Sequence, residues 1–205
     1  MITVSKTNAA IGLKAKTGRA IAVVLSGTLD APQLVSRSEI NLTDPHVPAT
    51  FQPYHEVMEL PWVEVQQKVK PFVRAIEKVA VKALMQLIHE LRAQGLIVCG
   101  IGIVGSLDRD LVKIGNYHIR AHAAEGMLFR QVLEHAAQSN KLAHRTFAEK
   151  TLASHAPTEL QLTVAQLNKQ LKIIGQDAGP PWRTDQRAAA TAAWLMLKMR
   201  SISTK

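Results

Sequence analysis

The amino-acid sequence predicts an α/β fold in which helices cover both faces of a mixed sheet. Two observations carry this prediction: three strand-like segments come first, and helical segments then alternate with two further apolar strands. A three-stranded meander followed by β-α-β units gives a sheet that is partly antiparallel and partly parallel. We expect a single domain over residues 1–205, because the chain contains no repeat and no low-complexity linker.

The first two strands are predicted to form a hairpin. Apolar runs at 9–15 and 20–25 flank Lys16-Thr-Gly-Arg19, in which Gly18 can adopt a positive φ. The first run is apolar almost throughout, which is typical of a strand covered on both faces. Lys14 interrupts this run, and an ionised lysine is costly to bury without a partner. We therefore expect Lys14 to face a polar cleft or a carboxylate.

The later elements follow from the spacing of apolar residues and from capping signals. Apolar residues recur at three and four in the helical segments, and the fourth strand is apolar on both faces. Thr158-Glu-Leu-Gln161 has the pattern of a capping box, which predicts that a helix begins there. The predicted elements are a strand over 33–40, a loop insertion over about 41–61, a helix over 64–94 with Pro71 as a kink or boundary, a strand over 96–104, a helix over 116–139, a strand over 142–148, a helix from Thr158 to about Ile174 and a final helix over 184–199.

The composition favours an acidic partner. Lysine and arginine number 25 against 16 aspartates and glutamates, so the formal net charge is +9 and DNA or RNA is a possible partner. The single cysteine, Cys99, excludes an intramolecular disulfide. The sequence lacks a signal-peptide pattern and an apolar stretch long enough to span a bilayer. We expect a cytoplasmic location and no membrane partner.

Three segments occur in an informative order. They are Ala10-Ile-Gly-Leu-Lys-Ala-Lys-Thr-Gly18, His122-Ala-Ala-Glu-Gly126 and Asp185-Gln-Arg-Ala-Ala-Ala-Thr-Ala-Ala-Trp194. In this order they resemble the first strand, a small-residue turn and the last helix of RuvC-type Holliday-junction resolvases. The resemblance covers most of the chain and implies a ribonuclease H-like fold. The chain also resembles bacterial proteins of unknown function that share Gly179-Pro-Pro-Trp-Arg-x-Asp-Gln186.

The chain departs from that family at the catalytic positions. Family members hold two Mg²⁺ ions with carboxylates and cut a phosphodiester. Lys14 stands where the family has its first aspartate, residues 101–105 contain no acid, and Ala188 replaces a ligand that would follow Asp185. We therefore reject a standard two-metal nuclease and expect no cofactor. The resemblance then implies a catalytically degenerate protein, a pseudoenzyme, that binds branched or duplex nucleic acid.

Five residues are candidates for the cleft that the resemblance implies: Lys14, His55, His122, Glu125 and Asp185. Lys14 and Asp185 are expected to meet there as an ion pair. His55 could join His122 and Glu125 as acid and base if the loop at 51–56 folds over the cleft. The alternative function is therefore a small-molecule or phosphoester enzyme, in which Lys14 stabilises an anion and a histidine is the general base. A second alternative is an inert interaction protein that forms oligomers such as a homodimer.

Two helical patterns have both a functional and a structural interpretation. His118, His122 and Glu125 project from one helix face, where they could bind Zn²⁺, but a partly buried polar stripe is the favoured interpretation and no metal is predicted. Four basic residues recur at every fourth position and could contact phosphates, although a solvated helix face has the same pattern. These candidate nucleic-acid-binding residues are Lys70, Arg74, Lys78 and Lys82.

Overall fold

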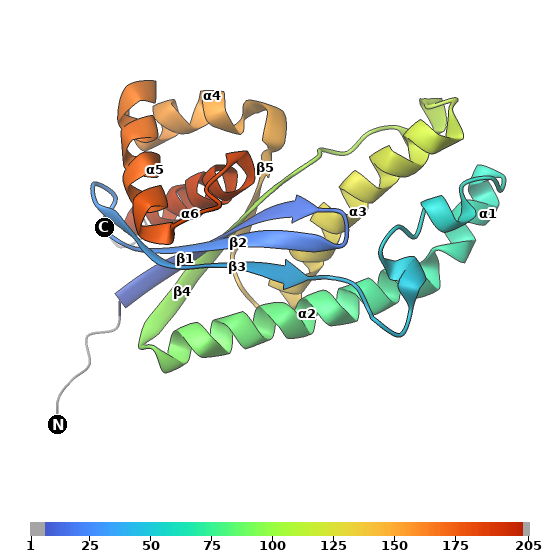
Figure 1. Ribbon diagram of the computed structural model, residues 1–205, viewed down its shortest axis with the longest axis horizontal. Coiled ribbons are helices and arrows are strands. Elements are labelled where there is room, and N and C mark those ends of the chain that lie inside the picture. The colour runs from blue at the N-terminus through green and yellow to red at the C-terminus, as the bar shows by residue number, and fades with distance from the viewer. Residues whose placement is uncertain (1–6, 203–205) are drawn as a thin grey trace.

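The centre of the molecule is a five-stranded mixed sheet in the order β3-β2-β1-β4-β5 (Figure 1). The computed structural model describes the backbone of residues 7–202 and the side chains of residues 7–198. β1, β2 and β3 pair antiparallel as a meander, whereas β4 is parallel to β1 and β5 is parallel to β4. The predicted α/β architecture is confirmed. The strands are β1 (Thr7–Lys16), β2 (Arg19–Gly27), β3 (Pro32–Asn41), β4 (Leu96–Gly105) and β5 (His144–Ala148).

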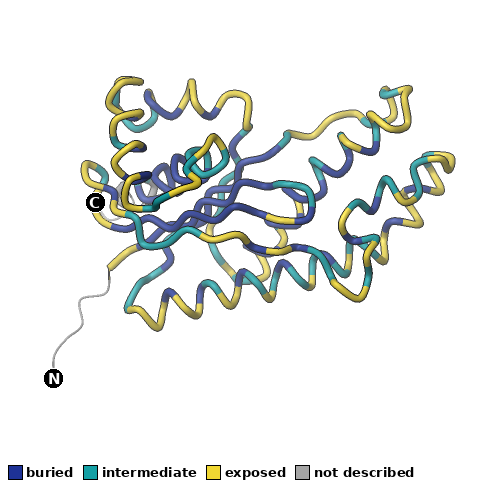
Figure 2. The backbone as a smooth tube through the Cα atoms, viewed as in Figure 1, coloured by how far each residue is buried: buried dark blue, intermediate teal, exposed yellow. Residues whose placement is uncertain are grey.

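Helices cover both faces of this sheet. One apolar core lies between the sheet and the pair α2 and α3, and a second lies between the sheet and the group α4, α5 and α6. Figure 2 shows β1, β2 and β4 buried along most of their length. The helices are α1 (Trp62–Lys68), α2 (Lys70–Ala93), α3 (Tyr117–Ser139), α4 (Glu149–Leu160), α5 (Val164–Ala178) and α6 (Thr184–Ile202), with short 3-10 turns η1 (Pro48–Thr50), η2 (His55–Val57) and η3 (Leu111–Lys113).

Side chains of β1 alternate between the two cores, as a strand covered on both faces requires. Ile11 and Leu13 face α2 and α3, whereas Ala10 faces α6. A Cβ atom on Gly12 would lie 1.8 Å from the carbonyl oxygen of Ala189 in α6. The backbones of β1 and α6 therefore approach so closely at Gly12 that no residue with a Cβ atom fits there without a shift of α6. The same alternation directs Lys14 to the α6 face.

The observed helix boundaries agree with the sequence-based prediction near Pro71 and differ from it at Thr158. The predicted boundary near Pro71 is confirmed, because α1 and α2 meet at Val69 and Pro71 lies in the first turn of α2. The predicted helix start at Thr158 is wrong. A separate helix, α4, already occupies 149–160 and ends at Gln161, whose φ is 59°. The capping box lies at Thr163, whose backbone N–H donates to Gln166 Oε1 at 2.7 Å.

Two similar sequence patterns explain the wrong helix start at Thr158. Thr158-x-x-Gln161 and Thr163-x-x-Gln166 both match a capping box, but only the second follows the left-handed residue that ends the previous helix.

Among the helices of residues 7–202, none combines the length and the apolar character needed to cross a bilayer. The predicted domain span of 1–205 includes residues 1–6 and 203–205, which lie outside the described residues.

Candidate functional site

Charged side chains gather where the parallel strands end. β1, β4 and β5 run in the same direction, so their carboxyl ends lie at one edge of the sheet, where open α/β proteins bind ligands. We call Lys14, Lys16, Glu149 and Asp185 the strand-end cluster. Lys14 Nζ lies 2.8 Å from Glu149 Oε2, and Lys16 Nζ lies 3.1 Å from Asp185 Oδ2. Lys14 also donates to the carbonyl oxygen of Ala15 at 3.1 Å.

The expected ion pair between Lys14 and Asp185 is therefore wrong, although the expected carboxylate partner of Lys14 exists. Glu149 is the first residue of α4 and directly follows β5, so its carboxylate lies at the same sheet edge as the end of β1. Asp185, in the first turn of α6, instead reaches Lys16, two residues further along the same face of β1. Sequence reasoning missed Glu149 because it missed α4. The available signal was an acid immediately after the fifth strand.

The strand-end cluster does not fit two magnesium ions. Two lysines balance its two carboxylates, and β4 ends in Val104 and Gly105, which offer no side-chain oxygen. Two octahedral magnesium ions need several oxygen ligands and net negative charge around them, whereas the cluster offers two carboxylates that are each paired with a lysine. A cavity of about 300 Å³ lies beside the cluster. It is lined by Gly105, Ser106, Leu107, Asp108, Arg109, Ala148, Glu149, Lys150 and Thr151.

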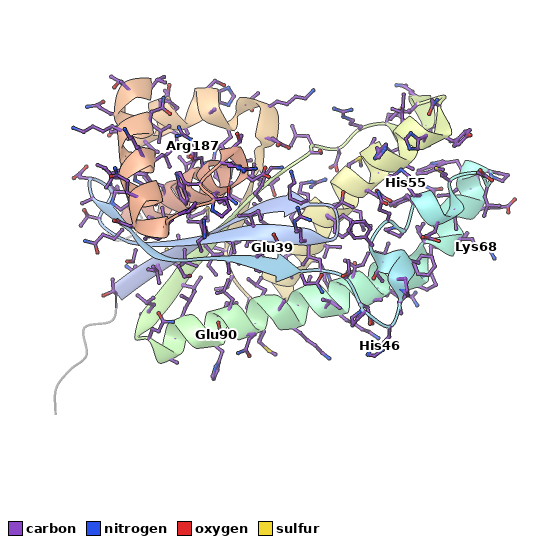
Figure 3. The ribbon with its side chains drawn as sticks, viewed as in Figure 1. Glu39, His46, His55, Lys68, Glu90 and Arg187 are labelled. Carbon is purple, nitrogen blue, oxygen red and sulfur yellow. The ribbon has the colours of Figure 1, made fainter. Side chains whose placement is uncertain are left out.

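A second group of side chains lies between α3 and the turn η2. We call His55, His118 and His122 the histidine cluster, and Figure 3 shows His55 between α3 and the segment that leads into α1. One ring nitrogen from each of the three side chains lies within 4.8 Å of the other two. Asn116 caps α3 by accepting a hydrogen bond from the backbone N–H of Ile119 at 2.9 Å. This cap starts the helix, and His118 and His122 then share one face, one turn apart.

Glu125 orients His55 through two contacts to one carboxylate oxygen. His55 Nδ1 lies 2.8 Å from Glu125 Oε1, and the backbone N–H of His55 donates to the same oxygen at 3.3 Å. Glu125 is only 1% exposed, and its Oε2 has no hydrogen-bond partner among the described residues; neither has His55 Nε2. The loop at 51–56 thus folds over α3, as the acid–base hypothesis requires. Since a carboxylate only accepts, Nδ1 carries the proton and Nε2 carries the lone pair in neutral His55.

The structure divides the five predicted cleft residues into two groups. Lys14 and Asp185 lie on the α6 face of the sheet, whereas His55, His122 and Glu125 belong to α3 and its surroundings on the other face. The expectation of one shared cleft is therefore wrong, because the two faces of β1 are filled by different helices. The predicted metal-ligand set also changes: His55 takes the third position, and Glu125 lies behind it.

Aromatic residues line the side of the histidine cluster nearest α1. Tyr54 stacks on Trp62 with ring centroids 6.0 Å apart, and the guanidinium of Arg120 lies 5.4 Å above the Trp62 ring. Burial, and secondarily the negative charge of Glu125, raise the pKa of Tyr54 above its ordinary value of 10.0. Tyr54 therefore stays protonated near neutral pH. It also lines a groove of about 620 Å³ together with Lys70 and Arg74.

The four basic residues predicted on the long helix lie on the outside of α2. We call them the basic row; all four are exposed, and none of them forms an ion pair within the part of the chain that the structure describes. A groove of about 580 Å³ runs along them. It is lined by Asp44, Gln67, Lys70, Pro71, Arg74, Ala75, Lys78, Val79 and Lys82.

Comparison with solved structures identifies the fold. RuvC of Thermus thermophilus superposes with a TM-score of 0.51 at 10% identity, covering 94% of this chain and 96% of that one. T. thermophilus RuvC in complex with Holliday junction substrate gives 0.50 at 12% identity, with coverages of 94% and 95%. The yeast mitochondrial Holliday junction resolvase Ydc2 gives 0.49 at 11% identity, with coverages of 94% and 80%. No family model and no curated protein sequence matches the chain.

Proposed function

We propose that this chain, which has a RuvC-like ribonuclease H fold, binds duplex or branched nucleic acid through the basic row on α2. The observation that carries the proposal is the row itself: four exposed cations on one helix, none neutralised by a described carboxylate within ion-pair distance. Residues four apart on a helix rise about 6 Å, so the row extends over about 18 Å. Such a row can contact successive phosphates and release their counterions.

We further propose that the strand-end cluster does not cut nucleic acid by the two-metal route. Support comes from Lys14, which is 4% exposed and occupies the position at which the resemblance places a metal-binding aspartate. Its ammonium repels a dication at that position, and Glu149 and Asp185 are each engaged by a lysine. Binding without two-metal cleavage is the function that these contacts favour.

The test is a salt series with labelled junction, duplex and single-stranded DNA and RNA, followed by fluorescence anisotropy. The variant K78Q/K82Q removes two charges from the basic row. The matched control K169Q/K172Q removes two exposed charges from α5, on the opposite side of the sheet. We expect K78Q/K82Q to lower the slope of log affinity against log salt by about 2, since each lost phosphate contact lowers it by about 1. Equal losses in both variants, or no salt-sensitive binding by the natural chain, would contradict the proposal.

The alternative, a small-molecule or phosphoester enzyme, is favoured by one contact, the hydrogen bond from His55 to Glu125. In that function the unpartnered Nε2 of His55 is the general base. The same lone pair can instead bind a metal ion, so the two roles exclude each other.

We also propose that the chain forms a homodimer, which a measurement of its mass in solution tests.

A further inference from the structure

We propose that the histidine cluster is a binding site for a divalent transition-metal ion, zinc above all. The site lies on the α3 face of the sheet and uses nitrogen ligands. It is therefore separate from the strand-end cluster, and it does not depend on the proposed binding of nucleic acid.

The distances suit a metal after small side-chain rotations. The three ring nitrogens lie within 4.8 Å of one another, and the ring centroids are 4.4, 4.5 and 5.2 Å apart. Tetrahedral zinc with bonds of about 2.0–2.1 Å to nitrogen requires nitrogens about 3.3 Å apart. His118 and His122 are exposed and can rotate to close this difference, whereas His55 is held by Glu125.

Glu125 prepares His55 for a metal. Metal-binding histidines almost always donate their second ring N–H to a carboxylate or a carbonyl, which fixes the tautomer and makes the free nitrogen a better ligand. His55 has this arrangement, with Nδ1 on Glu125 Oε1 and Nε2 buried without a described hydrogen-bond partner. The ring is therefore oriented by a bond that serves ligation by Nε2.

The charge of Glu125 also calls for a cation nearby. A carboxylate that is 1% exposed is costly unless its charge is compensated, and the only hydrogen bonds described for Glu125 come from His55. One of its oxygens and the Nε2 of His55 are both buried and have no hydrogen-bond partner within residues 7–198. A divalent ion bound to His55 would compensate the carboxylate through the imidazole. Without a metal, the Nε2 of His55 stays buried with no hydrogen-bond partner among the described residues.

The donor set selects the ion and leaves one position open. Three imidazoles favour zinc, copper or nickel over magnesium or calcium, which prefer oxygen ligands. Three protein ligands leave the fourth tetrahedral position for water, on the side where His118 and His122 are exposed. A water molecule bound there would lose a proton more readily than bulk water. An acid–base pair of His55 and Glu125 alone does not explain why two further histidines converge on the same point.

The test uses the full chain freed of metal by dialysis against a chelator. Isothermal titration with ZnCl₂ measures stoichiometry and affinity, and the visible absorption of added Co²⁺ reports the coordination geometry. We expect one ion per chain and tetrahedral cobalt bands. H118A and H122A each remove an exposed ligand and should weaken zinc binding more than about 100-fold. E125Q should weaken it about 10- to 100-fold, as loss of an outer-shell partner does.

The matched control is H135A, which removes an exposed histidine from the same helix outside the cluster. It should bind zinc as tightly as the natural chain. Equal zinc affinity in H118A, H122A and H135A, or no stoichiometric binding by the natural chain, overturns the proposal. If E125Q fails to fold, the two exposed histidine variants still decide the question.

Discussion

The ammonium of Lys14 lies 2.8 Å from the carboxylate of Glu149, and the two side chains differ sharply in exposure: 4% for the lysine and 49% for the glutamate. The contact joins the end of β1 to the start of α4. Because only the lysine is buried, the two halves of the ion pair do not contribute equally to stability. Loss of Glu149 leaves a buried charge with one carbonyl partner, whereas loss of Lys14 leaves a carboxylate that water can reach.

We therefore predict that E149A lowers the free energy of unfolding by about 1–3 kcal/mol, and that K14M changes it by less. Urea denaturation at neutral pH measures both. E39Q is the control, because Glu39 and its partner Arg19 are both well exposed and such pairs contribute about 0–1 kcal/mol. A larger loss of stability in K14M than in E149A would contradict this explanation, because it would show that burial of the ammonium does not decide which substitution costs more.

The sequence could predict the sheet because its signals are local. The apolar runs and the turn at Gly18 predict strands and a hairpin without knowledge of the tertiary structure. The positive φ of 71° at Gly18 confirms the predicted hairpin turn. The partner of Lys14 could not be predicted in the same way. It depends on α4, whose start at the end of β5 carries no capping side chain.

The contact between β1 and α6 yields a second prediction. In G12A, the new Cβ would lie 1.8 Å from the Ala189 carbonyl oxygen and 2.8 Å from the Ala193 nitrogen. These are backbone atoms of a buried helix, so the variant must shift α6 or fail to fold, at a cost above about 3 kcal/mol. Thermal unfolding measures the loss. G115A is the control, because beyond its two chain neighbours no atom of the described residues lies within 4 Å of its Cβ position; an equal loss there would contradict the steric explanation.

The sequence predicts only part of the histidine cluster. His118 and His122 share a face because they are four residues apart, which helical geometry alone predicts. His55 joins them from a loop 63 residues before His118, and no periodicity predicts where such a loop folds. The resemblance to the resolvase family implies one cleft for Lys14, Asp185 and these histidines. The alternation of side chains along β1 places Lys14 on the other face of the sheet, the face that α6 covers and on which Asp185 lies.

Tyr54 reports on the charge of Glu125 and gives a third prediction. Y117F leaves Tyr54 as the only tyrosine, so the near-ultraviolet absorbance of tyrosinate then follows Tyr54 alone. Burial and the charge of Glu125 raise its pKa above 10.0, and adding E125Q should shift the pKa back toward that value, because only the effect of burial remains. An unchanged titration would show that the carboxylate does not act on Tyr54.

The same shift has a consequence for stability with a definite sign. The protonated phenol is favoured in the folded chain relative to the unfolded chain, whose pKa is near the ordinary value of 10.0. The resulting stabilisation is complete below that pH and is lost as the pH rises through the raised pKa of the folded state. Urea denaturation at increasing alkaline pH should therefore show a smaller loss of stability in Y54F than in the natural chain.

The proposed metal site predicts a stabilisation that zinc confers and a chelator removes. An ion that binds only the folded chain adds about 2.7 kcal/mol at a free concentration 100 times its Kd. For a chain of this size, that corresponds to a rise in Tm of about 5–10 °C. Scanning calorimetry with and without ZnCl₂ should show this rise in the natural chain and in H135A but not in H122A, and EDTA should reverse it. A rise of equal size in H122A would mean that zinc binds elsewhere, because His122 lies within the cluster and His135 lies outside it.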